Sequence, residues 1–194
     1  NNLRYGAAGD DRRGYTGGRD VLDGGTGDDT ADFSSFGSAV WVDLGYAGTT
    51  EAFTRDDVDL DSGSWRAIAD LRSVEDITGT VHADELRGDG GDNRLFGGAG
   101  TDILDGAAGN DVLVGGSGGD TFVFDPGFDS ATVRGWQDDT DLLDLRGFGF
   151  SDFDTLESLA SDGGDNLLID FTTGDSLTLI GLTTADFTKS DTLL

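Results

Sequence analysis

Polar and apolar positions repeat every nine residues in two stretches of the chain, 6–32 and 79–123. Each nonamer has an acidic or amide residue at position six, and most have a glycine-rich start and a large apolar residue at position eight. Side chains alternate along a strand, so position eight points inward while its neighbours face out. Each nonamer therefore predicts one turn and one short strand. The position-eight residues are Arg13, Leu22, Ala31, Leu86, Leu95, Leu104, Leu113 and Phe122.

The residues at position six decide the chemistry of the turns. They are Asp11, Asp20, Asp29, Asp84, Asn93, Asp102, Asp111 and Asp120. If two nonamers make one coil, equivalent carboxylates stack about 4.8 Å apart. At an effective dielectric near 20, two such charges repel by about 3.5 kcal/mol. A cation between them would turn this repulsion into attraction. Calcium fits better than magnesium, because it accepts 6 to 8 oxygen ligands and mixes carboxylates with backbone carbonyls.

Composition narrows the function further. The net charge is −27, and 35 of the 39 acidic residues are Asp, which suits turns rather than helices. One Lys and eleven scattered Arg argue against nucleic acid and anionic membrane as partners. The absence of Cys excludes disulfides, and the single histidine, His82, argues against zinc sites and catalytic triads. No apolar run approaches the ~20 residues of a membrane span. The start carries neither Met nor a signal-peptide pattern, which predicts a processed or partial chain.

The nonamers resemble the RTX (repeats-in-toxin) calcium-binding nonapeptide GGxGxDxUx, in which U is a large apolar residue. The full consensus occurs at 97–105 and 115–123, and 24–32 departs from it only at Ala31. The resemblance implies an all-β fold, a right-handed parallel β-roll (β-solenoid) that binds calcium. On this reading residues 1–123 form the roll with a non-repeat insertion at 33–78. Residues 124–194 form a cap and a secretion-signal region.

The resemblance also implies ligands for each ion. One turn offers the carbonyls of positions one and three with its Asp, and the turn two nonamers later offers those of positions two and four with its own Asp. The predicted sets are Gly79, Val81 and Asp84 with Gly98, Gly100 and Asp102; Gly88, Gly90 and Asn93 with Ala107, Gly109 and Asp111; Gly97, Ala99 and Asp102 with Gly116, Gly118 and Asp120; and Gly6, Ala8 and Asp11 with Gly25, Gly27 and Asp29. Asn93 predicts a weaker site, because its amide oxygen is a neutral ligand. We expect about four to seven ions from the repeat count.

The nine-residue frame can be extended past the obvious repeats, although the alternative that it stops there is equally open. The extension reaches Gly127 with Asp129, and then Asp138. These would complete sites with Gly106, Ala108 and Asp111, and with Gly115, Ser117 and Asp120. Its inward positions would be Ala131 and Thr140.

The insertion at 33–78 allows two interpretations. Residues 40–44 alternate like a strand, 55–64 form an acidic loop that either holds a further calcium ion or is solvated, and 71–80 resemble the segment that leads back into RTX repeats. The aromatic residues of the insertion either present a platform to a sugar or partner protein, or cap and fill the roll. They are Trp41, Tyr46, Phe53 and Trp65.

The C-terminal region predicts the closing cap that a stacked fold needs, since its last coil cannot bury its apolar face alone. Residues 125–128 form a turn and 141–150 a strand that runs into a loop. Residues 151–160 form a short helix with Ser151 as N-cap, and 166–171 and 176–182 form a hairpin. The final residues, DTLL, resemble the C-termini of proteins exported by type I secretion.

These observations predict a non-catalytic calcium-binding module of a larger secreted bacterial protein, with folding triggered by extracellular calcium and export by type I secretion machinery. The alternative is a calcium-dependent polysaccharide-binding accessory module of an adhesin or a polysaccharide-modifying enzyme. A chain that is itself an enzyme is not expected, because a catalytic carboxylate pair needs contrasting environments. The periodic Asp residues already have a ligand role, and His82 lies on a turn.

Overall fold

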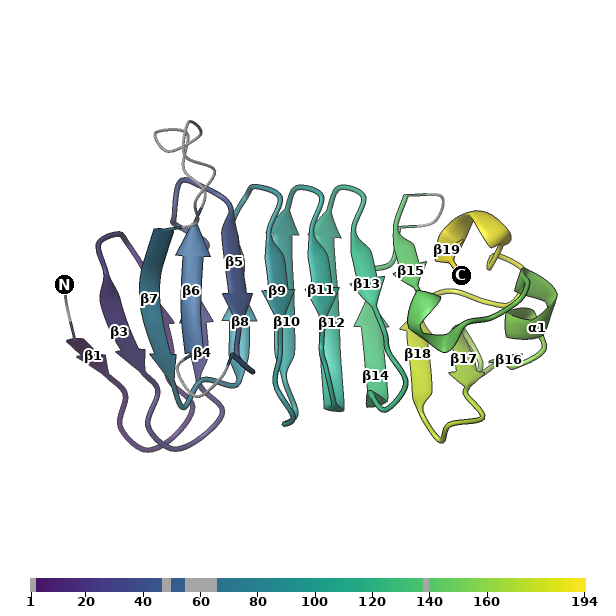
Figure 1. Cartoon of the computed structure of the whole chain (residues 1–194), viewed down its shortest axis with the longest axis horizontal. Helices are drawn as coiled ribbons and strands as arrows, with labels where there is room; N and C mark the ends of the chain where they lie inside the picture. The colour runs from purple at the N-terminus through teal and green to yellow at the C-terminus, as the bar shows by residue number, and fades with distance from the viewer. Residues whose placement is uncertain (1–2, 47–49, 55–65, 138–139) are drawn as a thin grey trace.

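The computed structural model describes residues 3–46, 50–54, 66–137 and 140–194. It is almost entirely β-structure, as predicted. Two long sheets extend along the molecule and face each other, and the chain passes back and forth between them (Figure 1). The described residues form one short α-helix and two 3-10 helices, all in the C-terminal third.

The two sheets are called the first sheet and the second sheet. The first sheet contains, in spatial order, β1 (Leu3–Tyr5), β3 (Asp20–Asp23), β7 (Arg66–Arg72), β6 (Thr50–Thr54), β5 (Val40–Asp43), β9 (Glu85–Arg87), β11 (Ile103–Asp105), β13 (Thr121–Val123), β15 (Leu142–Asp144) and β19 (Thr192–Leu193). The second contains β16 (Ala160–Asp162), β17 (Asn166–Asp170), β18 (Ser176–Ile180), β14 (Asp129–Arg134), β12 (Gly109–Ser117), β10 (Arg94–Ala99), β8 (Asp76–Thr78), β4 (Thr30–Asp32) and β2 (Arg12–Gly14).

The register follows from the nine-residue repeat. Successive nonamers alternate between the two sheets, so strands within one sheet pair in parallel with an offset of 18 residues. Leu104 of β11, for example, lies between Leu86 of β9 and Phe122 of β13. The same offset relates β2 to β4, β8 to β10 and β10 to β12. Two nonamers therefore make one coil, as predicted.

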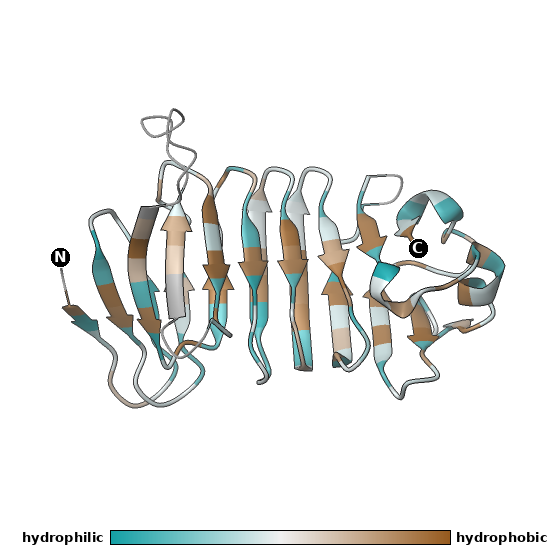
Figure 2. Cartoon of the chain, in the orientation of Figure 1, coloured by the Kyte–Doolittle hydropathy of each residue, from teal (hydrophilic) through white to brown (hydrophobic). Residues whose placement is uncertain are grey.

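The core is a thin apolar layer between the sheets. Leu22, Leu86, Leu104 and Phe122 have no exposed surface, and Leu95 and Leu113 complete the same layer from the second sheet. Buried residues alternate with exposed or half-buried ones along β10 and β12, and Figure 2 shows the apolar residues of the strands in brown. The inward direction of position eight is thus confirmed for every apolar member of the series, including Ala31.

The insertion widens the first sheet without interrupting the second. In the second sheet β4 pairs directly with β8, and Thr30 lies beside Asp76. In the first sheet β5 and β6 are antiparallel, as are β6 and β7, and β5 then pairs in parallel with β9. The strand predicted at 40–44 is β5. The predicted acidic loop at 55–64 and Trp65 lie outside the described residues.

Parallel pairing continues beyond residue 123 but leaves the nine-residue frame. The offset grows to 20 residues between β12 and β14, and to 21 between β13 and β15. Asp111 consequently lies opposite Ala131, while Asp129 lies opposite Gly109, so Asp129 does not pair with Asp111 as the extended frame required. Ala131 is buried as predicted, whereas Thr140 is exposed and Leu143 takes the inward position. Asp138 lies outside the described residues.

The C-terminal cap closes the core with aromatic side chains. Phe171 packs on Phe148 and Phe128, with ring centroids 4.4 and 5.5 Å apart. The predicted hairpin is confirmed by the antiparallel pairing of β17 with β18. The helix, α1 (Phe153–Glu157), is capped by Asp152 rather than Ser151, because the Asp152 carboxylate accepts the N–H of Thr155. Two 3-10 helices, η1 (Arg146–Phe148) and η2 (Lys189–Asp191), complete the cap. Within the described ranges, the helices are all too short or too polar to cross a membrane.

Candidate metal sites in the turns

A column of aspartates, here called the first ladder, lines the turns that lead into the first sheet. Its members are Asp84, Asp102, Asp120 and Asp141, and all four are buried. The Asp84 N–H donates to Asp102 Oδ1 at 2.7 Å, and the Asp102 N–H donates to Asp120 Oδ1 at 2.9 Å. The Asp120 N–H donates to Asp141 Oδ1 at 2.9 Å. The stacking of carboxylates inferred from the repeat is therefore present.

The second ladder lines the turns that lead into the second sheet and contains Asp11, Asp29, Glu75, Asn93 and Asp111. The Asp11 N–H donates to Asp29 Oδ1 at 2.8 Å, and the Asn93 N–H donates to Asp111 Oδ1 at 2.9 Å. The Asp29 N–H donates to Glu75 Oε2, also at 2.8 Å. Glu75 thus occupies the place of a position-six aspartate although it lies outside any nonamer.

Several ladder oxygens are buried without a hydrogen-bond partner. Among the described residues these include the Oδ2 atoms of Asp29, Asp102 and Asp120. Leaving a carboxylate oxygen in this state is costly unless a cation or proton joins it. A Cβ built on Gly97 would lie within 3.0 Å of both Asp102 Oδ2 and the Gly115 carbonyl oxygen. Only glycine fits there, and the two oxygens face the same small space. Carboxylate and carbonyl oxygens are the donors that calcium prefers.

The turns face one another in the opposite sense to the predicted ligand sets. The position-two carbonyl of Thr80 accepts from Ala99 of the later turn at 3.3 Å, while the position-three carbonyl of Ser117 accepts from Gly100 of the earlier turn at 2.9 Å. Positions two and four therefore face the later turn, and positions one and three face the earlier turn. The carbonyls that converge between turns 97–102 and 115–120 are those of Gly98, Gly100, Gly115 and Ser117. Between turns 6–11 and 24–29, the Thr26 N–H donates to the Ala7 carbonyl at 3.2 Å. The Ala7 carbonyl therefore faces the later turn, which is the role predicted for the carbonyls of Gly6 and Ala8.

The electrostatics of both ladders favour a bound cation. Burial raises the pKa of Asp102 to about 7, and the Asp84 and Asp120 carboxylates add to the rise. Burial likewise raises the pKa of Asp111 to about 7, with a further contribution from Asp92. A cation at these turns would favour the ionised carboxylates and lower both pKa values.

Side-chain amides fill two of the spaces between turns. Gln137 Nε2 donates to the carbonyls of Gly116 at 2.6 Å and Gly118 at 3.3 Å, which are the two that face the following turn. Asn93 Nδ2 donates to the Glu75 carbonyl at 2.8 Å. In both cases a side-chain amide donates to a backbone carbonyl of a neighbouring turn.

Sequence reasoning missed Asp141 and Glu75, while the metal role predicted for Asp20 stays a prediction. Asp141 follows Asp120 by 21 residues instead of 18, so the repeat frame passes over it. Asp20 is buried in β3, where the register places it beside Ala69 of β7. In the described part of the chain, no three His, Cys, Asp or Glu side chains converge as a metal site, so a cation would need the turn carbonyls as well.

The aromatic residues of the insertion lie on the outer face of the first sheet. Val40 and Val42 of β5 point into the core, which turns Trp41 outward. Trp41 lies opposite Phe53 of β6, with ring centroids 5.3 Å apart. The Trp41 ring also contacts the Tyr46 ring, with centroids 6.2 Å apart. Trp41, Phe53 and Tyr46, here called the outer aromatic patch, therefore do not fill the roll. Tyr46 is 46% exposed.

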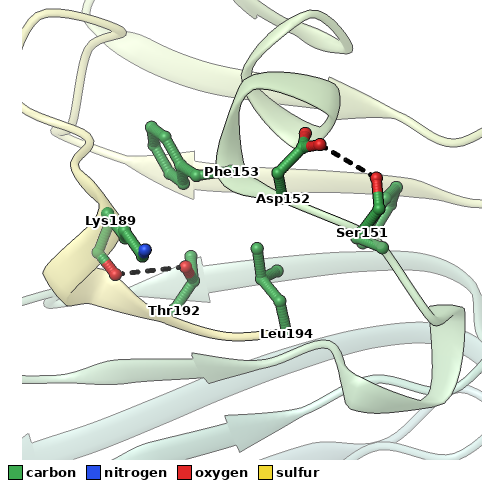
Figure 3. A pocket seen from close by; sticks show the side chains of 7 residues that line it. Ser151, Asp152, Phe153, Lys189, Thr192 and Leu194 are labelled. Carbon is green, nitrogen blue, oxygen red and sulfur yellow. Dashed lines mark hydrogen bonds between the residues drawn. The ribbon is translucent and has the colours of Figure 1, made fainter.

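A pocket of about 320 Å³ lies in the cap, between α1 and η2 (Figure 3). Phe153 and Leu194 form apolar walls, and Lys189 lies at its rim. Its carboxylate, Asp152, accepts hydrogen bonds from Thr155 and Ser151, which hold the Asp152 pKa below its usual value. This group is therefore an ionised helix cap rather than a general acid.

Two sheets of stacked nonamers, with carboxylates and carbonyls facing each other across the turns, define a calcium-binding parallel β-roll. The model of the RTX calcium-binding nonapeptide repeat family matches the chain in four copies, over residues 16–33, 78–113, 87–122 and 100–131. Residues 16–33 and 78–131 are therefore RTX calcium-binding repeats. A search of curated proteins gave no match to the chain.

Solved structures similar to the chain include the AlgE6R3 subunit of the Azotobacter vinelandii mannuronan C5-epimerase. The two share 29% identity with a TM-score of 0.51, over 61% of this chain and 76% of that one. A second similar structure is the extracellular lipase LipA from Serratia marcescens, at 20% identity and a TM-score of 0.42. That match covers 99% of this chain but 39% of the lipase.

Proposed function

We propose that this chain is a non-catalytic calcium-binding module of a larger exported protein, and that calcium outside the cell drives its folding. Without calcium, the stacked carboxylates of both ladders repel one another and oppose the compact state. With calcium, the binding free energy becomes folding free energy. Sites with the ~10⁻⁴ to 10⁻³ M affinities of extracellular modules would respond to the difference between a cell interior and its surroundings.

The observation that carries this proposal is the pair of buried, unpartnered oxygens Asp102 Oδ2 and Asp120 Oδ2. Neither oxygen has a hydrogen-bond donor in the described residues, and Asp102 Oδ2 faces the same small space as the Gly115 carbonyl oxygen. We propose that calcium binds between stacked repeat turns at four pairs of ladder residues. The pairs are Asp11 and Asp29, Asp84 and Asp102, Asp102 and Asp120, and Asn93 and Asp111.

Calcium titration followed by far-UV circular dichroism tests the proposal. Wild-type protein should lose its β-signal in excess chelator and regain it cooperatively with calcium. Asp102→Asn removes a carboxylate shared by two spaces and should raise the calcium midpoint at least tenfold. The matched control is Asp165→Asn, which removes one charge at an exposed position and should move the midpoint less than twofold. A wild-type roll that stays fully folded in chelator would overturn the proposal.

A second candidate function, binding of a polysaccharide, is favoured by the outer aromatic patch. Aromatic side chains on a flat, exposed sheet can stack on sugar rings, and the rings of Trp41, Phe53 and Tyr46 are adjacent there. The relevant measurement is retention of calcium-loaded protein on immobilised alginate or pectate. Trp41→Ala should abolish retention and leave the calcium-bound circular dichroism spectrum unchanged. Equal retention of the wild type and the variant would exclude this patch as the binding surface.

Export by type I secretion is part of the same proposal and is supported by the sequence resemblance of DTLL. These residues pack in the cap, where Asp191 is buried and β19 pairs with β15. The folded cap thus holds the segment that a transporter would read, with Leu193 still 37% exposed. This arrangement is compatible with export of the chain before calcium folds it.

A further inference from the structure

The two parts of the roll meet at a seam in the second ladder, where repeat turn 24–29 faces the non-repeat turn 73–75. The seam lies where β4 pairs with β8 across the insertion, and the Glu75 N–H donates to the Asp29 carbonyl at 3.1 Å. The Asp29 N–H in turn donates to Glu75 Oε2 at 2.8 Å. Neither Ser73 nor Glu75 belongs to a nonamer, so the repeat pattern assigns no ion here.

Asp29 presents an oxygen with no partner at this seam. The residue is only 1% exposed, its Oδ1 accepts the Asp11 N–H, and its Oδ2 is buried without any hydrogen bond. A buried carboxylate oxygen in this condition calls for a cation or a proton. The charges around it are mostly negative: Asp28, Glu75 and Asp76 lie nearby, and Asp76 is paired with Arg94 at 3.5 Å.

The seam reproduces the arrangement found between repeat turns. A Cβ on Gly24 would lie within 3.0 Å of both Asp29 Oδ2 and the Ser73 carbonyl oxygen. In the repeats, a Cβ on Gly97 would meet Asp102 Oδ2 and the Gly115 carbonyl oxygen in the same way. Ser73 therefore supplies the carbonyl of a position-one glycine. It has a positive φ of 46°, which turns this short loop tightly. The longer Glu75 side chain supplies the carboxylate that a position-six aspartate would otherwise provide.

We propose that Asp29, Glu75 and the Ser73 carbonyl form an additional calcium site that joins the two parts of the roll across the insertion. The donors are two carboxylates and a backbone carbonyl, which is a set suited to a hard divalent cation. This inference rests on the proposed calcium-binding function. The seam site adds one ion to those bound between repeat turns, and this ion would link the turns that lead into β4 and β8.

Counting bound calcium by native mass spectrometry, with affinities from isothermal titration calorimetry, tests the site on the whole chain. Glu75→Gln keeps the shape of the side chain and should bind one calcium ion fewer than wild type, or bind that ion at least tenfold more weakly. The matched control is Glu85→Gln, which removes a glutamate from the exposed face of β9 and should keep every ion. If Glu75→Gln does not fold, Glu75→Lys places an ammonium beside Asp29 and should give a folded protein that also lacks one ion.

The outcomes separate this inference from the function on which it rests. Wild-type protein that binds no calcium would overturn the calcium-binding function itself. Wild-type protein that binds calcium, together with a Glu75 variant that binds the same number of ions with the same affinities, would overturn only the seam site. Loss of one ion from the Glu75 variant and from no control supports it.

Discussion

Neighbouring residues of one strand have opposite roles in this fold. Leu104 has no exposed surface and stacks between Leu86 and Phe122, whereas Ile103, the preceding residue, is 42% exposed on the outer face. The roll has only one thin apolar layer, so each inward side chain contacts both its own sheet and the facing one. A vacancy in this layer is difficult to refill by local movement.

Leu104→Ala should therefore lower the free energy of unfolding of the calcium-loaded module by about 2 to 5 kcal/mol. Ile103→Ala, the control on the same strand, should cost about 1 kcal/mol or less, because it changes strand propensity more than buried area. Urea denaturation in saturating calcium measures both. Similar losses from the two variants would contradict the assignment of inward and outward faces.

At the scale of the element, the first glycine of a repeat turn is restricted by close approach rather than by backbone angle. Gly97 leaves no room for a Cβ against Asp102 Oδ2 and the Gly115 carbonyl. Gly90, at position three of the preceding nonamer, has nothing within 4 Å of an added Cβ. The glycine-rich consensus therefore contains positions with different physical requirements.

Gly97→Ala should destabilise the calcium-loaded protein by about 1 to 3 kcal/mol, as overpacking does, and should raise the calcium midpoint. Gly90→Ala should leave both quantities nearly unchanged, since nothing lies within 4 Å of its added Cβ. Calcium-dependent circular dichroism combined with urea denaturation compares them. If Gly90→Ala were as damaging as Gly97→Ala, conformational freedom rather than space would be the constraint.

At the scale of the whole molecule, the roll is continuous despite the insertion. One cluster of buried side chains extends from Tyr15 to Phe187, and β4 pairs with β8 without a gap in the second sheet. Trp41 reports on the insertion, whereas Trp136 packs against Phe122 near the other end, with ring centroids 5.9 Å apart. The two ends of the roll therefore have separate optical probes.

Calcium-dependent folding should occur in one transition. Trp65→Phe/Trp136→Phe leaves Trp41 as the single probe, and Trp41→Phe/Trp65→Phe leaves Trp136. Their fluorescence changes should have the same calcium midpoint, because neither end can bury its apolar layer without the other. Midpoints that differ by more than about threefold would show that the two parts fold as separate units.

The sequence alone determined the features that repeat at short range. The nine-residue frame placed Leu86, Leu104 and Phe122 in one buried column and Asp84, Asp102 and Asp120 in one ladder, because each coil spans only 18 residues. Local periodicity fixes such contacts, since a rung pairs with the next rung along the chain.

The tertiary structure decided what depends on pairing across longer or irregular spacings. Glu75 entered the second ladder because β4 and β8 pair across 46 residues, and Asp141 entered the first because three extra residues precede β15. The direction of the turn carbonyls and the outward position of Trp41 likewise follow from how strands and turns stack. No local pattern records these relations, because they are set by the sheet register, which joins segments that are distant in the sequence.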